Sequence, residues 1–208
     1  MNILVIGSGA REHAIVRTIE RSEKDKKIFC LATNVNPGIE KLCSDLTVAN
    51  INDTQTITSY ADERAVDLAI IGPENPLAIG AADALWDMGV KAIGPRKDLA
   101  QIETSKAFTR DLLTEYNIPA CPKYKTFSSL SGVEEFLSEL GENYVVKYDG
   151  LAGGKGVKVS GDHLHSHDDA KIYCQELVEK GGVFVLEEKL IGQEFSLMSF
   201  CDGENLKH

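Results

Sequence analysis

The chain has 208 residues, of which 43% are hydrophobic, and its 22 Lys and Arg against 32 Asp and Glu give a formal net charge of −10. This length is enough for one large or two small domains with a buried core. The acidic balance argues against nucleic acid or an anionic membrane as the main partner. No apolar run approaches the roughly 20 residues of a membrane helix, and the N-terminus lacks the pattern of a secretory signal peptide.

The first hundred residues alternate between short apolar segments and helical patterns. Strands are predicted at 3–6, 27–33, 46–49, 66–72 and 90–94, and helices at 11–22, 54–65 and 75–89. Continuous apolar strands alternating with helices are typical of an open parallel sheet covered on both faces. The pattern around Trp86 and Met88 predicts ordinary core packing in the third helix.

The second half of the chain has a different pattern. A helix is predicted at 99–117, ended by prolines, and further helices at 129–141 and 167–181. Strands are predicted at 123–127, 143–148, 156–160 and 183–190. This order predicts a second, α+β unit.

The five cysteines are Cys30, Cys43, Cys121, Cys174 and Cys201. They are odd in number, and no two have the C-x-x-C spacing. This usage is typical of a reduced protein with small buried thiols and disfavours a disulfide framework. We therefore expect a cytoplasmic location.

A glycine turn, Gly7-Ser8-Gly9, follows the first strand and opens a helix. Backbone N–H groups and the helix dipole suit an anion there, which predicts a phosphate site. A dinucleotide fingerprint is disfavoured because Glu12 stands at the third glycine position and would hinder close helix–strand packing. A plain tight turn is the alternative. Arg11, Glu12 and His13 favour a ligand site, because open α/β sheets bind ligands at this edge.

A second loop follows the strand at 66–72 and holds Pro73, Glu74 and Pro76. It lies at the same carboxyl edge of the predicted sheet, and the prolines stiffen the backbone around the carboxylate. A ligand contact by Glu74 and a surface turn that caps a helix are equally compatible with this pattern.

A long glycine-rich segment, "YVVKYDGLAGGKGVKV" at 144–159, joins two predicted strands. Glycines let backbone N–H groups approach phosphate oxygens, and lysine supplies a point charge to a polyphosphate. A Walker A loop is excluded because a strand, not a helix, follows. The segment predicts either a simple hairpin or a nucleotide-binding flap between antiparallel strands, with Lys147, Gly153, Gly154, Lys155 and Gly156 as its candidate residues.

An apolar strand then ends in Glu187 and Glu188, and Glu194 follows. Acidic groups that close a buried strand are costly unless they are exposed or engaged. A strand edge can bind adenine and a carboxylate can accept hydrogen bonds from ribose. A solvated acidic turn is the alternative.

Six segments in chain order carry a resemblance: "VIGSGAREHA", "DLAIIGPENPLAIG", "IGP", "SKAFTRDLL", "VVKYDGLAGGKGV" and "LEEKLIGQEFS". The chain resembles the glycinamide ribonucleotide synthetase (phosphoribosylamine–glycine ligase) family of the ATP-grasp superfamily. The departures are Ala10 for the usual glycine, Tyr148 for the usual alanine, and a loose match in "NVNPGIEK".

The resemblance implies a fold and a reaction. The fold is a Rossmann-like pre-ATP-grasp domain at 1–101, an ATP-grasp first lobe at 102–190 and the start of a second lobe at 191–208. The reaction joins glycine to 5-phosphoribosylamine through a glycyl phosphate and converts ATP to ADP and phosphate. ATP and Mg²⁺ or Mn²⁺ are the implied cofactors, and the partners are small molecules, without nucleic acid or membrane.

Site residues also follow from the resemblance by matching position. Lys155 is expected to act in catalysis. The residues expected to bind ATP are Lys106, Lys147, Gly153, Gly154, Lys155, Gly156, Glu187, Glu188, Leu190 and Glu194. Those expected on the phosphoribosylamine side are Gly9, Arg11, Glu12, His13, Pro73 and Glu74. The family's metal ligands are expected beyond residue 208, so we expect the 208-residue chain alone to be inactive.

Three rival functions stay open at this stage. One is another ATP-grasp carboxylate–amine ligase or carboxylase, one is a nucleotide-binding module without chemistry, and one is an NAD-dependent oxidoreductase. The alternating His163, His165 and His167 could bind a metal if they lay on a strand. We expect instead a solvated turn with Ser166 or His167 at the N-cap of the following helix.

Overall fold

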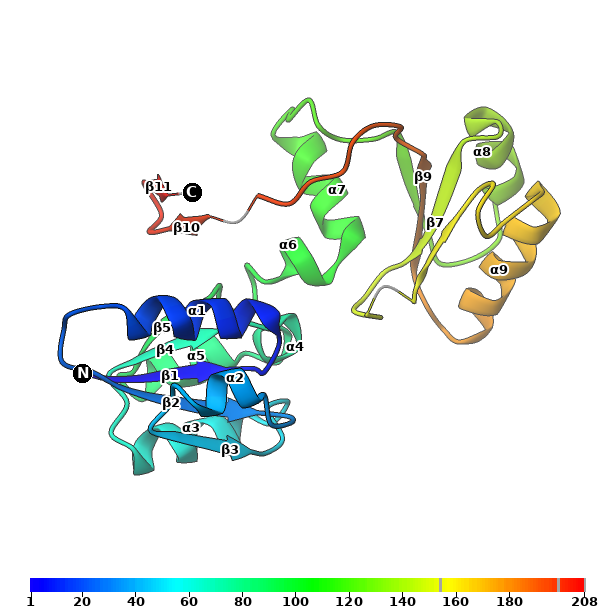
Figure 1. Cartoon of the computed structure of the whole chain (residues 1–208). Coiled ribbons are helices and arrows are strands. Elements are labelled where there is room, and N and C mark those ends of the chain that lie inside the picture. Colours follow the sequence, from blue (N-terminus) through cyan, green and yellow to red (C-terminus); the bar gives the residue numbers. More distant parts are fainter. Residues whose placement is uncertain (154, 198, 208) are drawn as a thin grey trace. The chain divides into compact units, whose positions relative to one another are not determined.

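A computed structural model describes residues 1–153, 155–197 and 199–207 (Figure 1). The chain forms two compact units. Unit 1 is Met1–Cys121 with Tyr148–Gly156, and unit 2 is Pro122–Lys147 with Val157–His208. The glycine-rich segment therefore groups by its contacts with unit 1, although the strands that flank it continue into unit 2.

Unit 1 is built on a five-stranded parallel sheet, which confirms the predicted fold class. Its strands are β1 (Asn2–Ile6), β2 (Lys27–Ala32), β3 (Asp45–Val48), β4 (Leu68–Ile71) and β5 (Lys91–Ile93), in the order β3-β2-β1-β4-β5. The chain winds outward from β1 in one direction and then returns to add β4 on its other side. The carboxyl ends of β1 and β4 are thus the switch point at which open α/β sheets bind ligands.

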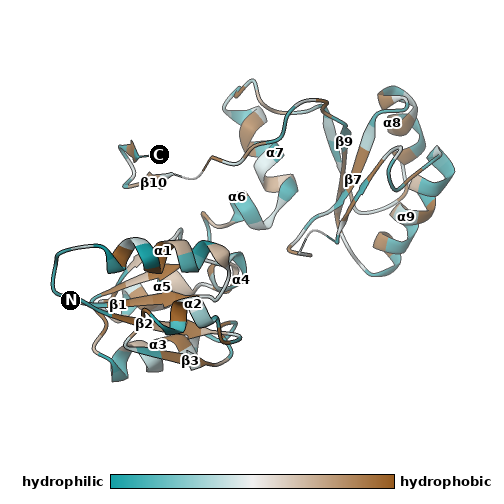
Figure 2. Ribbon diagram, viewed as in Figure 1, coloured by the Kyte–Doolittle hydropathy of each residue, from teal (hydrophilic) through white to brown (hydrophobic). Residues whose placement is uncertain are grey.

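Helices cover both faces of this sheet, and the central strand β1 is largely brown, or apolar, in Figure 2. One face packs on α1 (Ala10–Glu20) and α2 (Pro37–Glu40) through a core that includes Val5, Val16, Cys30 and Ile39. The other packs on α3 (Thr54–Glu63) and α5 (Ala81–Asp87) through Leu4, Ile6, Leu31, Ile57 and Leu85. Because both faces are buried, the four residues of β1 from Ile3 to Ile6 are all apolar.

Two predicted helices are each split in the structure. The segment 75–89 forms α4 (Glu74–Ala78) and α5, because Gly80 has φ 91° and breaks the helix. The segment 99–117 forms α6 (Gln101–Thr104) and α7 (Lys106–Glu115), because Ser105 is extended and caps α7. The predicted core packing of Trp86 and Met88 is wrong, because these residues are 42% and 37% exposed.

Unit 2 holds a four-stranded sheet with helices, as the α+β prediction expected. The strands are β6 (Tyr124–Phe127), β7 (Tyr144–Tyr148), β8 (Val157–Val159) and β9 (Phe184–Glu188), in the order β6-β9-β7-β8. The β6–β9 and β7–β8 pairs are antiparallel. Its helices are α8 (Val133–Leu140) and α9 (His167–Glu179). Phe127 stacks on Phe184 in the core, with ring centroids 5.5 Å apart.

Two short strands, β10 (Phe200–Cys201) and β11 (Leu206–Lys207), form an antiparallel pair that the sequence pattern did not predict. The cysteine prediction holds for Cys30 and Cys174, which are buried, and is wrong for Cys201, which is exposed. Burial raises the pKa of both the Cys30 and the Cys174 thiol to about 12. Across the described ranges, no helix is long and apolar enough to cross a membrane.

Candidate functional site

Two glycine turns meet at the switch point of the parallel sheet. Ile6 at the end of β1 lies beside Ile71 at the end of β4. The next residues, Gly7 and Gly72, continue the pairing, because the Gly72 N–H donates to the Ile6 carbonyl at 3.1 Å. The strands therefore deliver the two predicted loops, 7–13 and 72–74, to the same edge.

Arg11 joins these two loops. Its Nη1 donates to the Gly72 carbonyl at 2.6 Å and to Glu74 Oε1 at 3.0 Å. The hydrogen bond that Arg11 donates to the Glu74 carboxylate raises the pKa of Arg11. Burial alone would raise the pKa of Glu74, but hydrogen bonds from its own backbone N–H and from Arg11 bring that pKa below its usual value. Arg11 and Glu74 leave 44% and 37% of their side chains exposed, so both can also reach a ligand.

Glu12 points inward, away from the exposed face of the site. The residue is 5% exposed, and its Oε2 accepts the Gly9 N–H at 2.6 Å. A Cβ on Gly72 would lie 2.1 Å from Glu12 Oε1, and one on Gly7 would lie 2.9 Å from Glu12 Cγ. The two glycines thus make the room that Glu12 fills. Glu12 shapes the turn by occupying one of the donors that a helix N-terminus leaves unpaired.

The loop after β2 is attached to the first glycine turn, and sequence reasoning missed it. Ser8 Oγ donates to Asn34 Oδ1 at 2.9 Å, and Asn36 Nδ2 donates to the Ser8 carbonyl at 2.9 Å. The half-buried ring of His13 packs so closely on Gly38 that a Cβ there would lie 2.4 Å from its Cε1. Two asparagines that precede a Pro-Gly pair, in Asn34-Val35-Asn36-Pro37-Gly38, were the available signal.

A cavity of about 350 Å³ opens beside Glu74. Its walls are mostly apolar and include Leu77, Pro95, Leu99 and Ile102, with Glu103 as a second carboxylate. Pro73, which was predicted on the substrate side, is the N-cap of α4 and lies next to Gly7.

Lys106 and the glycine-rich segment meet within unit 1. Lys106 is the first residue of α7, and its Nζ donates to the Gly150 carbonyl at 3.0 Å. The Tyr148 N–H donates to the Gly156 carbonyl at 2.8 Å, which closes the base of the segment. Lys155 is exposed, and its backbone N–H donates to the Ala152 carbonyl at 3.0 Å. Gly153 has φ 54°, and Gly154 lies outside the described residues.

Lys147 and Glu187 form an ion pair within unit 2. Lys147 Nζ lies 2.5 Å from Glu187 Oε1, and the two side chains are 23% and 4% exposed. Such a pair satisfies the buried carboxylate at the end of β9. Glu188 Oε1 accepts the Lys123 N–H at 2.9 Å, which ties β9 to the start of β6. Leu190 is 69% exposed and Glu194 is exposed.

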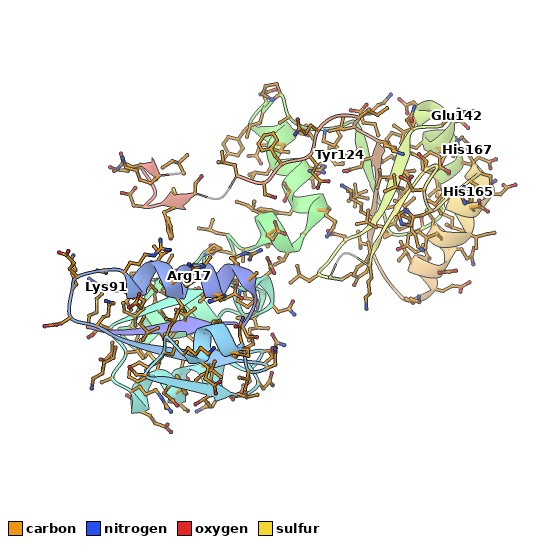
Figure 3. The ribbon with its side chains drawn as sticks, in the orientation of Figure 1. Arg17, Lys91, Tyr124, Glu142, His165 and His167 are labelled. Atoms are coloured by element: carbon orange, nitrogen blue, oxygen red, sulfur yellow. The ribbon has the colours of Figure 1, made fainter. Side chains whose placement is uncertain are left out.

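The histidine cluster leads into a helix, as expected. Ser166 is the N-cap of α9 and accepts the Asp169 N–H. His167 Nε2 lies 2.8 Å from the Gly141 carbonyl, and Figure 3 shows His165, His167 and Glu142 close together beside α9. Within the part of the chain that the structure describes, no group of three or more potential metal ligands is found.

Comparison with known proteins identifies the family. Residues 1–103 match "Phosphoribosylglycinamide synthetase, N domain", and residues 104–208 match "Phosphoribosylglycinamide synthetase, ATP-grasp (A) domain". The chain belongs to the phosphoribosylglycinamide synthetase family. This confirms the resemblance that the six sequence segments carried.

Curated relatives named phosphoribosylamine–glycine ligase support the same assignment. The protein from Methanosarcina barkeri is 44% identical over 206 residues, which are 99% of this chain and 47% of the relative. The protein from Methanococcus vannielii is 46% identical over 213 residues, covering 99% and 48%. This chain thus spans about half the length of the curated relatives it matches.

Solved structures show the same fold. A phosphoribosylamine–glycine ligase from Thermotoga maritima matches with a TM-score of 0.77 at 22% identity, covering 99% of this chain and 48% of that one. An N5-carboxyaminoimidazole ribonucleotide synthetase, solved as an ADP complex, matches with a TM-score of 0.68 at 19% identity, covering 91% and 47%.

Proposed function

We propose that this chain belongs to an ATP-dependent carbon–nitrogen ligase that joins glycine to 5-phosphoribosylamine, giving glycinamide ribonucleotide, ADP and phosphate. The observation that carries the proposal is the switch-point site, where Arg11 bridges the Gly72 carbonyl and Glu74 in a member of this family. The names of the curated relatives support the same reaction. We place the enzyme in the cytoplasm, with small molecules as its partners.

The chemistry requires charge neutralisation more than a protein nucleophile. A glycine carboxylate oxygen would attack the γ-phosphorus of ATP and release ADP. The amine of 5-phosphoribosylamine would then attack the glycyl carbonyl carbon, lose a proton and release phosphate. Cationic side chains around the transferred phosphoryl group stabilise such a reaction. This is the role we propose for Lys155, with Lys106 and Lys147 as further phosphate contacts.

The remaining roles divide between nucleotide and substrate. We propose that ATP contacts Gly153, Gly154, Gly156, Glu187, Glu188, Leu190 and Glu194, and that 5-phosphoribosylamine contacts Gly9, Arg11, His13, Pro73 and Glu74. Glu12 would act by shaping the first turn, because its carboxylate is buried. We propose domains at 1–101, 102–190 and 191–208.

A divalent cation, Mg²⁺ or Mn²⁺, would accompany ATP, because such ions bridge the phosphates in phosphoryl transfer. The described residues contain no cluster of three or more carboxylate, histidine or cysteine ligands for it.

Thermal unfolding of the 208-residue chain tests the nucleotide part of the proposal. Mg-ATP is expected to raise the Tm, because a ligand at 100 times its Kd stabilises the folded state by about 2.7 kcal/mol. Lys155→Ala should weaken this shift. Lys91→Ala should not, because Lys91 begins β5 at the opposite end of the strand from the carboxyl edge. A Tm shift with NAD alone would contradict the proposal, and the absence of a shift with Mg-ATP would contradict the placing of the nucleotide contacts within these 208 residues.

A further inference from the structure

Asp149 links two distant segments of unit 1. It directly follows β7, and its carboxylate accepts three hydrogen bonds from the start of α7. Oδ1 accepts the backbone N–H groups of Lys106 at 2.5 Å and Ala107 at 3.2 Å, and Oδ2 accepts the Ser105 hydroxyl at 3.0 Å. These partners lie 42 to 44 residues earlier in the chain.

These contacts satisfy the first backbone N–H groups of α7. A helix leaves its first N–H groups without partners inside the helix. Asp149 takes those of Lys106 and Ala107, and Ser105 Oγ takes that of Phe108 at 3.1 Å. A carboxylate is favoured there by the helix dipole and by charge-assisted hydrogen bonding. The start of α7 is thus already occupied by an internal anion.

A further contact reaches back from α7. The Lys106 side chain extends from the same turn and donates through Nζ to the Gly150 carbonyl at 3.0 Å. Both the backbone and the side chain of Lys106 are therefore held by the pair Asp149 and Gly150. By its contacts, the segment Tyr148–Gly156 belongs to unit 1, which agrees with the attachment of Asp149 and Gly150 to α7.

We propose that Asp149 is a positioning residue for nucleotide binding. It fixes the Lys106 ammonium at the base of the glycine-rich segment, so that the charge need not be ordered when a polyphosphate binds. Pre-organisation of this kind raises affinity because less conformational entropy is lost on binding. The inference rests on the proposed function, since it takes ATP as the ligand. A purely structural role, in which Asp149 only caps α7, is the competing explanation.

A double-mutant cycle on the 208-residue chain separates the two explanations. The variants are Asp149→Ala, Lys106→Ala and the double variant, and the measurement is the Kd for Mg-ATP by calorimetry. If Asp149 acts through Lys106, each single change weakens binding at least tenfold, and the double variant is within twofold of Lys106→Ala. The proposal would be overturned if the fold-increase in Kd of the double variant equalled the product of the two single increases. It would also be overturned if Asp149→Ala bound Mg-ATP with wild-type affinity.

Asp53→Ala is the matched control. Asp53 also caps a helix of unit 1, because its carboxylate accepts the Thr56 N–H at the start of α3. This change should lower the Tm and leave the Kd for Mg-ATP unchanged. If it weakens ATP binding as much as Asp149→Ala does, loss of a helix cap alone explains the effect and the positioning role is wrong.

Amide hydrogen exchange tests the anchor without nucleotide. Asp149→Ala should speed exchange of the Lys106 and Ala107 amides at least tenfold, because their acceptor is removed. Asp149→Asn keeps an acceptor oxygen and serves if the alanine variant does not fold; it should speed exchange less. Unchanged exchange in both variants overturns the anchor whatever the nucleotide result. If the wild-type chain has the anchor but binds no Mg-ATP, the positioning role fails, whereas the proposed ligation reaction is tested separately by the response to NAD.

Discussion

Arg11 Nη1 and Glu74 Oε1 lie 3.0 Å apart, although 63 positions separate the two residues in the sequence. The pairing of β1 with β4 brings them together, because each residue follows its strand by a few positions at the same sheet edge. The ion pair can therefore form only after β1 and β4 have paired. It orients both charges at the proposed substrate site.

The first prediction concerns the pH dependence of this pair. The folded-state pKa of Glu74 lies below its usual value, so the pair adds stability above about pH 4.3 and loses it as the pH falls through the folded pKa. Glu74→Gln should therefore lower the free energy of unfolding at pH 7 and have little effect near pH 3. The loss should be about 0.2–1 kcal/mol, since the pair is exposed.

Arg11→Met is the matching change on the other side of the pair. It should cost more at pH 7 than Glu74→Gln, because it also removes the hydrogen bond to the Gly72 carbonyl, and Glu74→Gln should add little to it, which denaturant unfolding can measure. A loss in Glu74→Gln that is equal at pH 7 and pH 3 would show that the ion pair is not its source.

The second prediction concerns Gly72. A Cβ there would lie 2.1 Å from the buried Glu12 carboxylate, so Gly72→Ala should destabilise unit 1 by about 1–3 kcal/mol through overpacking. The double variant Gly72→Ala with Glu12→Ala should lose less free energy of unfolding than the two single variants together, because the shorter side chain at position 12 makes room for the new methyl group. The fluorescence of Trp86, on α5, can follow unfolding of this unit.

Gly192→Ala is the control, because a Cβ at Gly192 meets nothing within 4 Å. It should leave the unfolding midpoint nearly unchanged. Additive losses for Gly72→Ala and Glu12→Ala would contradict the close packing of these two residues.

Local pattern was enough to predict the parallel sheet and the antiparallel strands around the glycine-rich segment. Strands such as β1 are buried on both faces, so their apolar runs are unbroken and easily recognised. Ser166 was also predictable as a helix cap, because it acts on residues that follow directly. Both signals lie within a few residues of the element that they define.

Features that depend on distant residues could not be predicted. Asp149 caps α7 from more than 40 positions away, and nothing near either segment shows the match. The inward turn of Glu12 depends on Gly72, which lies on another strand end. Helix α2 has four residues, too few to show a helical period. The break at Gly80 was missed because a single glycine inside a helical pattern is often tolerated.

The third prediction concerns the order of cysteine reactivity. The thiolate is the reactive form, and burial raises the pKa of Cys30 and Cys174 to about 12 while also blocking access. Cys201 is exposed. With a disulfide reagent at pH 8, Cys201 should react at least tenfold faster than Cys30 and Cys174, and urea should remove the difference. Cys201→Ser should abolish the fast phase, and a persistent fast phase on Cys30 or Cys174 would contradict the burial.

The fourth prediction concerns the ion pair of Lys147 and Glu187. Glu187 is 4% exposed, so removing the Lys147 ammonium takes an ion-pair partner from a carboxylate in the interior of unit 2. Lys147→Met should lower the free energy of unfolding by about 2–4 kcal/mol, slightly below the range for fully buried pairs because Lys147 is 23% exposed.

Replacing both partners distinguishes the cost of a buried charge from that of a lost contact. Lys147→Met with Glu187→Leu should recover most of the loss, because well-packed apolar side chains often replace a buried ion pair at little cost. Asp162→Asn is the control: its carboxylate pairs with Lys189 at 3.4 Å but is 66% exposed, so the change should cost less than about 1 kcal/mol. If Lys147→Met is no more harmful than Asp162→Asn, the Glu187 carboxylate is stabilised by groups other than Lys147. Lys147→Met would then leave the stability of unit 2 nearly unchanged. The ATP affinity of the same variant would therefore test the proposed contact of Lys147 with ATP without a loss of stability.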